Sequence, residues 1–167
     1  MIYYITGGQR SGKSKYAQRL ALQLTENPIY LATSRLWDDS HTQRINQHQA
    51  ERSKNWTTIE EEKHIGRLIL PGKVVVMDCV TLWLNNFFTD THYNVEQALQ
   101  LAKKEMDTFI NQDFTLIIIS NEIGMGVHPV TEAGHKFIDL QGWMNQHIAE
   151  FANQIVLLIS GVAVKIK

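Results

Sequence analysis

The sequence predicts an α/β domain of three layers, in which helices cover both faces of a mostly parallel central sheet. Five short runs are continuously apolar rather than alternating, as in strands that are buried on both faces. Segments with helical periodicity lie between these runs, and this alternation favours a parallel sheet with helices on either side. The runs are Ile2–Ile5, Ile29–Ala32, Val74–Met77, Leu116–Ile119 and Ile155–Ile159.

The first predicted strand leads into a glycine-rich loop, and a predicted helix over residues 15–24 follows it. The loop reads G-x-x-x-x-G-K-S, which between a strand and a helix is a P-loop. Its backbone N–H groups and the helix N-terminus would attract nucleotide phosphates. Lys13 would reach the outer phosphates, and the hydroxyl of Ser14 would bind Mg²⁺. The residues of the loop are Gly7, Gly8, Gln9, Arg10, Ser11, Gly12, Lys13 and Ser14. The sequence therefore predicts that a nucleoside triphosphate binds, but not what is done with it.

Residues 38–52 predict a helix with almost no apolar face. Arg44, His48 and Arg52 recur every four residues and therefore share one face. The two guanidinium charges disfavour protonation of His48, which keeps its imidazole neutral and nucleophilic. Two interpretations stay open: His48 attacks a nucleotide phosphorus to give a phosphoramidate, or the helix is an ordinary charged surface in solvent.

The third apolar run ends in Asp78, the pattern of a Walker B strand. Beside a P-loop such a carboxylate would bind Mg²⁺ directly or through water. Alternatively, Asp78 is a turn or N-cap aspartate. The fourth run leads to Asn121 and Glu122, and Glu122 can support the metal, position a substrate hydroxyl or merely end the strand. Ligands of such sheets bind beyond the carboxyl ends of the strands, so these residues and residues 33–35 are the candidates for a site.

Two amphipathic helices are predicted in the second half of the chain, each with one core-facing stripe. One stripe consists of Val95, Leu99, Ala102, Met106 and Ile110, and the other of Phe137, Leu140, Met144, Ile148 and Phe151. A last short strand over 162–167 would add an edge to the sheet. We place Cys79 inside the third strand and interpret it as a small core residue rather than a nucleophile.

Composition predicts one domain over residues 1–167, because 44% hydrophobic and 20% charged residues are ordinary for a globular chain of this length. A net charge of −1 argues against nucleic acid or an anionic membrane as partner. A single cysteine suits a reducing cytoplasm, and neither a signal peptide nor a run long enough to cross a bilayer is evident. The histidines other than His48 have no metal-ligand spacing, so a zinc site is not expected.

These motifs together resemble the bifunctional adenosylcobinamide kinase / adenosylcobinamide-phosphate guanylyltransferase family of cobalamin biosynthesis, over essentially the whole chain. The motifs are the P-loop at 7–14, Tyr30–Ser34, Arg44-Ile45-x-x-His48-x-x-x-Arg52 with Trp56 and Glu60, and residues 78–86, 121–129 and 160–162. A P-loop alone would be generic, whereas this ordered series is specific.

The resemblance implies a RecA-like P-loop fold, a homotrimer and two reactions that use ATP or GTP with Mg²⁺. A nucleoside triphosphate first phosphorylates the terminal hydroxyl of adenosylcobinamide. GMP from GTP is then transferred onto that phosphate through a guanylylated His48, which gives adenosyl-GDP-cobinamide and pyrophosphate. The implied nucleotide contacts are the P-loop, Ala32, Thr33, Ser34, Gln49, Ala50, Glu51, Arg52, Glu60 and Asp78. We expect Glu60 to accept hydrogen bonds from the guanine N1–H and 2-amino groups, which adenine cannot offer as a pair.

Three alternatives stay open on the sequence. A plain P-loop small-molecule kinase would phosphorylate without releasing pyrophosphate. A RecA-like ATPase acting on nucleic acid would show salt-dependent DNA binding. A nucleotide-binding switch would bind GTP tightly with negligible turnover.

Overall fold

A seven-stranded sheet forms the centre of the protein in the computed structural model, which describes residues 1–35, 55–126 and 128–167. The strands are β1 (Ile2–Gly7), β2 (Ile29–Ala32), β3 (Thr57–Glu60), β4 (Val74–Asp78), β5 (Thr115–Ile119), β6 (Gln154–Ile159) and β7 (Val162–Lys165). Their order is β3-β2-β4-β5-β1-β6-β7, and all neighbours are parallel except β6 and β7. The predicted fold class is therefore confirmed, and the last short strand does form an edge.

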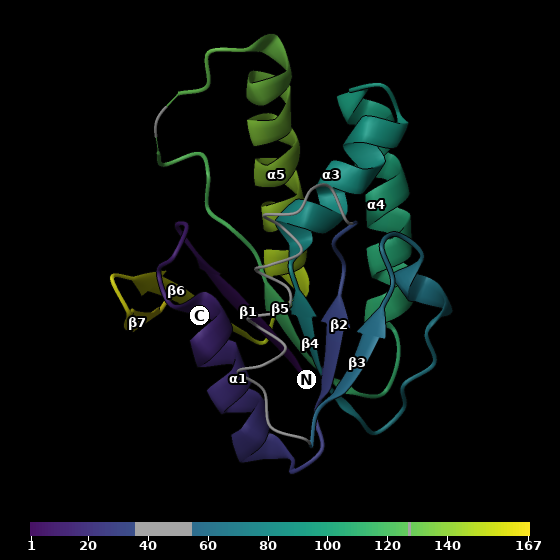
Figure 1. Cartoon of the computed structure of the whole chain (residues 1–167), viewed down its shortest axis with the longest axis vertical. Coiled ribbons are helices and arrows are strands. Elements are labelled where there is room, and N and C mark those ends of the chain that lie inside the picture. Colours follow the sequence, from purple (N-terminus) through teal and green to yellow (C-terminus); the bar gives the residue numbers. More distant parts are fainter. Residues whose placement is uncertain (36–54, 127) are drawn as a thin grey trace.

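Helices cover both faces of the sheet (Figure 1). Helix α1 (Lys13–Leu24) packs on one face, where Ala17 and Ala21 join a buried cluster with residues of β1, β4 and β5. Helices α3 (Val80–Asp90), α4 (Val95–Ile110) and α5 (Glu132–Phe151) pack on the other face and enclose the larger core. A short 3-10 turn, η1 (Ile65–Arg67), precedes β4. In the part of the chain that the structure describes, we find no helix with the length and apolarity that crossing a membrane requires.

One predicted strand end shifts where the chain enters the nucleotide side of the sheet. β1 continues to Gly7, two residues beyond its predicted end, whereas β4 ends at Asp78 as predicted. Cys79 lies after β4 as the N-cap of α3, so its placement inside the strand was wrong. Its interpretation as a small core residue holds, because it is buried and burial raises the pKa of its thiol to about 12.

Two elements lacked a clear sequence signal. Strand β3 is mostly exposed, and only Ile59 packs against the larger core, so it has no apolar run. Helix α3 has many apolar residues, but its buried residues lie around most of the helix and therefore form no single amphipathic stripe. They are Val80, Trp83, Leu84, Asn86, Phe87 and Phe88.

The two predicted amphipathic helices are confirmed as α4 and α5. Their first turns are capped by Asn94 and Thr131, whose side chains accept hydrogen bonds from the backbone N–H groups of Gln97 and Gly134. The core-facing role of Phe151 was wrong, since this residue ends α5, is 43% exposed and packs edge-on against the ring of His147.

Candidate nucleotide site

β1 delivers the P-loop to the carboxyl edge of the sheet, and two glycines make this possible. Gly12, the N-cap of α1, has a φ of +97°, in the left-handed region that favours glycine. Gly7 has a φ of +147°, and a Cβ there would lie 2.4 Å from the carbonyl oxygen of Leu158 in β6. α1 begins at Lys13, two residues earlier than predicted, so its unpaired N–H groups face the loop.

The side chain of Lys13 folds back into the P-loop. Its Nζ donates a hydrogen bond of 2.6 Å to the carbonyl oxygen of Gly8, and the residue is only 7% exposed. Burial lowers the pKa of Lys13, and the negative charge of Asp78 opposes that shift. The ammonium is thus held at the start of the loop, where phosphate oxygens can replace the carbonyl as stronger acceptors.

Ser14, Tyr30 and Asp78 bring three oxygen groups together beside the loop. The hydroxyls of Ser14 and Tyr30 each donate a hydrogen bond of 3.0 Å to Oδ2 of Asp78. Mg²⁺ prefers oxygen ligands and is typically held by one or two carboxylates together with substrate phosphates. The donor set therefore fits Mg²⁺. Asp78 does not serve as a helix cap, because the N-cap of α3 is Cys79.

An open cavity of about 680 Å³ lies between the P-loop, α1 and the ends of β4 and β5. Arg10, Lys13 and Lys15 contribute three positive charges to its lining, and Asp78 is the one carboxylate among the described lining residues. This excess of positive charge suits a polyphosphate. Residues 10–15 of the loop and helix start therefore converge with Asp78 on one space.

Sheet register places Glu60 and Asp78 in one row. Glu60 in β3 pairs with Ala32 in β2, and Ala32 pairs with Asp78 in β4. Side chains in register on parallel neighbours share a face, which here is the face of α1. With strands about 4.8 Å apart, the backbones of Glu60 and Asp78 are roughly 10 Å apart. Three residues predicted separately are thus brought to one edge of the sheet.

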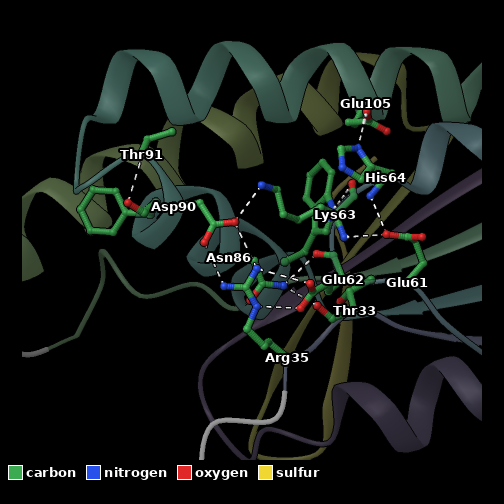
Figure 2. A network of polar contacts seen from close by, with 12 residues as sticks. Thr33, Arg35, Glu61, Glu62, Lys63, His64, Asn86, Asp90, Thr91 and Glu105 are labelled. Carbon is green, nitrogen blue, oxygen red and sulfur yellow. Dashed lines mark hydrogen bonds and ion pairs between the residues drawn. The ribbon is translucent and has the colours of Figure 1, made fainter.

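Ion pairs fix the loops that follow β2 and β3 (Figure 2). The guanidinium of Arg35 lies between two carboxylates, 2.7 Å from Glu62 and 2.9 Å from Asp90 at the end of α3. Lys63 contacts the same Asp90 at 2.8 Å. Hydrogen bonds from Arg35 and Lys63 hold the pKa of Asp90 well below its usual value. Asp90 thus joins the two loops to α3.

The buried amide of Asn86 connects the same two loops. Its Nδ2 donates to the carbonyl oxygens of Thr33 at 2.9 Å and Glu62 at 2.8 Å. Thr33 is itself fully buried, and its hydroxyl donates to the carbonyl oxygen of Cys79 at 2.9 Å. The hydroxyl of Thr33, a predicted nucleotide contact, therefore makes a hydrogen bond within the protein interior. The hydroxyl of the next residue, Ser34, donates to the carbonyl oxygen of Arg35.

The end of β5 is tied to its surroundings by backbone and amide groups. The backbone N and Nδ2 of Asn121 both donate to the hydroxyl of Thr81 at 3.1 Å, and its carbonyl accepts from Asn145 in α5. The next backbone N–H, that of Glu122, donates to the carbonyl oxygen of Gly7 at 3.0 Å. The segment after β5 is therefore fixed against the first residue of the P-loop.

One predicted part of the site lies outside the described residues, namely the helix over 38–52. It carries His48, Gln49, Ala50, Glu51 and Arg52. Trp56, which follows this segment and is among the described residues, packs edge-on against Tyr30 with 6.4 Å between ring centroids. It thus supports the tyrosine that contacts Asp78.

Sequence reasoning assigned no role to several residues that shape the site. Tyr30 shares the α1 face with Ala32, and this alternation along β2 was an available signal. Asn86 is a polar residue among large apolar ones in α3, which often marks a buried hydrogen-bonding role. Thr81 and Gln18 carried no comparable signal, because only the fold places them near the loop.

Comparisons with known proteins agree with these features. A family model described as "Cobinamide kinase / cobinamide phosphate guanyltransferase" matches residues 3–166. The "Bifunctional adenosylcobalamin biosynthesis protein CobU" of Escherichia coli is 32% identical over 182 residues, which cover 100% of both chains. The CobP protein of the same description from Pseudomonas aeruginosa is 32% identical over 168 residues, 98% of this chain and 95% of the relative.

A solved structure supports the architecture alone. The protein described as "a prototypical ATPase from the type III secretion system of pathogenic bacteria" superposes with a TM-score of 0.53 at 8% identity. The match covers 98% of this chain and 56% of the ATPase. Together with the sheet topology, it confirms the expected RecA-like arrangement.

Proposed function

This chain belongs to the cobinamide kinase / cobinamide phosphate guanyltransferase family, and we propose that one nucleotide site, at the P-loop, serves both of the family's reactions. Its activities are those of an adenosylcobinamide kinase and an adenosylcobinamide-phosphate guanylyltransferase in cobalamin biosynthesis. The observation that carries the proposal is the convergence of Lys13, Ser14 and Asp78 on one positively charged cavity. Either reaction requires such a set to hold a triphosphate.

In the kinase reaction, the acceptor alcohol attacks the terminal phosphorus and a nucleoside diphosphate leaves. The Lys13 ammonium and the N–H groups of the loop stabilise the charge on the transferred phosphoryl group. Mg²⁺ bound by Ser14 and Asp78 would neutralise charge on the phosphate oxygens. The hydroxyls of Tyr30 and Ser14 both donate to Oδ2 of Asp78 and thereby orient its carboxylate.

In the guanylyl transfer, His48 attacks the α-phosphorus of GTP and pyrophosphate leaves. The phosphate of adenosylcobinamide phosphate then displaces the histidine. Support for this half comes from the shared face of Arg44, His48 and Arg52 and from the family resemblance. Two arginines on that face would hold the phosphate oxygens under attack.

Base selection follows from the row that joins Asp78 and Glu60. Phosphates near Asp78 would leave the base within reach of Glu60, roughly 10 Å away across two strand spacings. A carboxylate accepts hydrogen bonds from the guanine N1–H and 2-amino groups, so Glu60 would favour GTP. Glu60→Gln should lower the affinity ratio of GTP to ATP, measured by calorimetry, and an unchanged ratio would remove Glu60 from this role.

The test of the proposed function is the intact mass of the protein after incubation with GTP and Mg²⁺. We expect the wild type to gain the mass of GMP and His48→Ala to gain none. His41→Ala removes an imidazole from the same segment and should still gain GMP. A wild type without the adduct, or His48→Ala with it, would refute the histidine intermediate.

Kinase activity separates the roles of the two residues. Lys13→Ala should lose both phosphorylation and the GMP adduct, because both need the triphosphate in the loop. His48→Ala should keep phosphorylation of adenosylcobinamide. Loss of both activities in a folded His48→Ala protein would argue against separate roles.

We also propose that residues 1–167 act as one nucleotide-binding domain, in the cytoplasm, as part of a homotrimer. The resemblance supports the trimer, and the single cysteine fits a reducing compartment. Light scattering of the purified protein should give three times the mass of the chain, and a monomer at working concentration would refute the trimer.

A further inference from the structure

We propose that Glu122 receives the hydroxyl that is phosphorylated in the kinase reaction, and that two cavities joined at Glu122 hold the rest of the acceptor. This inference rests on the proposed function, because it requires phosphoryl transfer at the P-loop. It adds the acceptor side of that reaction, where the residues described above hold only the nucleotide.

Glu122 is anchored at the end of the P-loop that the terminal phosphate reaches. Its backbone N–H donates to the carbonyl oxygen of Gly7 at 3.0 Å. In a P-loop the lysine ammonium contacts the outer phosphates. Here the ammonium of Lys13 donates to the carbonyl oxygen of Gly8, the residue after Gly7. Glu122 and the Lys13 ammonium are therefore both fixed to the first two residues of the loop.

A second cavity, of about 440 Å³, opens on this side of the loop. Gly8, Gln9, Glu122 and Met125 line it, together with Leu157 to Ser160 at the end of β6. Glu122 is its one carboxylate among the described lining residues, and the Ser14–Asp78 pair lines only the first cavity. The carboxylate of the metal site and the carboxylate of Glu122 thus serve different spaces, which argues for a role on the acceptor side.

A third cavity, of about 220 Å³, continues from Glu122 between residues 122–124 and α5. Gln141 lines it and is 1% exposed. Its Nε2 donates to Ser120 and Asn145, whereas its Oε1 accepts no hydrogen bond from any described residue. The third cavity therefore extends the space beside Glu122 toward α5.

One oxygen of the Glu122 carboxylate is held by a hydrogen bond, and the other is available to a substrate. Its Oε1 accepts a hydrogen bond of 3.0 Å from the backbone N–H of Gly124, and its Oε2 has no partner among the described residues. In the reaction, the alcohol oxygen forms a bond to the terminal phosphorus while the bond from that phosphorus to the bridging oxygen breaks. The nucleoside diphosphate leaves with the electron pair, and the alcohol proton passes to Oε2 of Glu122 and then to solvent.

Glu122→Gln tests this role, because the amide keeps the size of the side chain and its acceptor for Gly124 but cannot take the proton. With ATP and adenosylcobinamide, we expect kcat to fall about 100-fold or more. The GMP adduct formed from GTP should remain within twofold of wild type, since that step uses no acceptor hydroxyl. Glu132→Gln, an exposed carboxylate at the start of α5, is the matched control and should change neither reaction.

Trp143→Ala tests the cavities without disturbing the core, because Trp143 lines the third cavity and is about half exposed. We expect the KM for adenosylcobinamide to rise several-fold with little change in kcat or in the KM for ATP.

Two results would overturn the inference alone: kinase kcat of Glu122→Gln within threefold of an active wild type, or equal loss of kinase activity and GMP adduct in that variant. The second would mark Glu122 as a structural or nucleotide-side residue. A wild type that phosphorylates no adenosylcobinamide would instead overturn the proposed function and this inference with it.

Discussion

Replacing Asn86 with alanine should lower the free energy of unfolding by about 2–3 kcal/mol. The buried carbonyl of Thr33 would lose its donor, which costs about 1–3 kcal/mol, and the partly buried carbonyl of Glu62 would lose a bond worth about 1 kcal/mol. Alanine gains up to about 0.7 kcal/mol in helix propensity. The Oδ1 of Asn86 has no partner among the described residues, so its removal offsets part of the loss.

Urea denaturation measures this difference, and Asn85→Ala is the matched control. Asn85 precedes Asn86 in α3, is partly exposed and makes no side-chain hydrogen bond to another described residue. Both variants gain the same helix propensity, so their difference reports the loss of the two carbonyl bonds together with the removal of the unpartnered Oδ1 of Asn86. We expect Asn86→Ala to have a lower midpoint at unchanged m and a melting temperature lower by roughly 5–10 °C.

The same variant should bind nucleotide more weakly while folded, because Asn86 holds together the loops that carry Ser34 and follow Glu60. Equal stability of Asn86→Ala and Asn85→Ala would refute the reasoning. A less stable variant with wild-type nucleotide affinity would restrict Asn86 to a role in folding.

Three further predictions concern single contacts of the site. Tyr30→Phe removes one of the two hydroxyls that orient Asp78, so the Mg²⁺ concentration for half-maximal activity should rise about 10-fold; an unchanged requirement would contradict this. Asp90→Asn should cost about 1 kcal/mol at neutral pH. Because the folded pKa of Asp90 lies below its ordinary value of 3.8, this difference should stay constant above about pH 5 and shrink as the pH falls further, which urea titrations at several pH values would check. Cys79 should resist iodoacetamide at about pH 8 in the native protein and react once unfolded, because burial raises its pKa to about 12; fast native labelling in a mass spectrum would oppose this.

The sequence was most informative where local pattern and function coincide. Continuous apolar runs predicted five strands because those strands are covered on both faces, and the P-loop predicted the loop that leads from β1 into α1. Asp78 was identified from its position at a strand end. Its contact with Ser14 follows from the fold, since β4 and β1 are separated only by β5.

Features that depend on pairing and burial could not be read from the chain. β3 gives almost no apolar signal, because three of its four residues are exposed. The alignment of Glu60 with Asp78 depends on two strand registers that no single segment encodes. Thr33 stays a predicted nucleotide contact, but its sequence position did not show that its buried hydroxyl donates to the carbonyl oxygen of Cys79. The sequence could not show that Glu122 lines two cavities, because the cavities are formed by segments that are distant in the chain.

Backbone hydrogen bonds between β4, β2 and β3 fix the distance from Asp78 through Ala32 to Glu60, with about 4.8 Å between neighbouring strands. If the register of β3 slipped by a single residue, Ile59 would pair with Ala32 in place of Glu60. The carboxylate of Glu60 would then lie on the opposite face of the sheet. If Glu60 selects the base as proposed, the discrimination between guanine and adenine would then change although no nucleotide contact had been mutated. Substitutions that shift the docking of this edge strand on β2 are therefore a second way to alter base preference, independent of the chemistry of Glu60 itself.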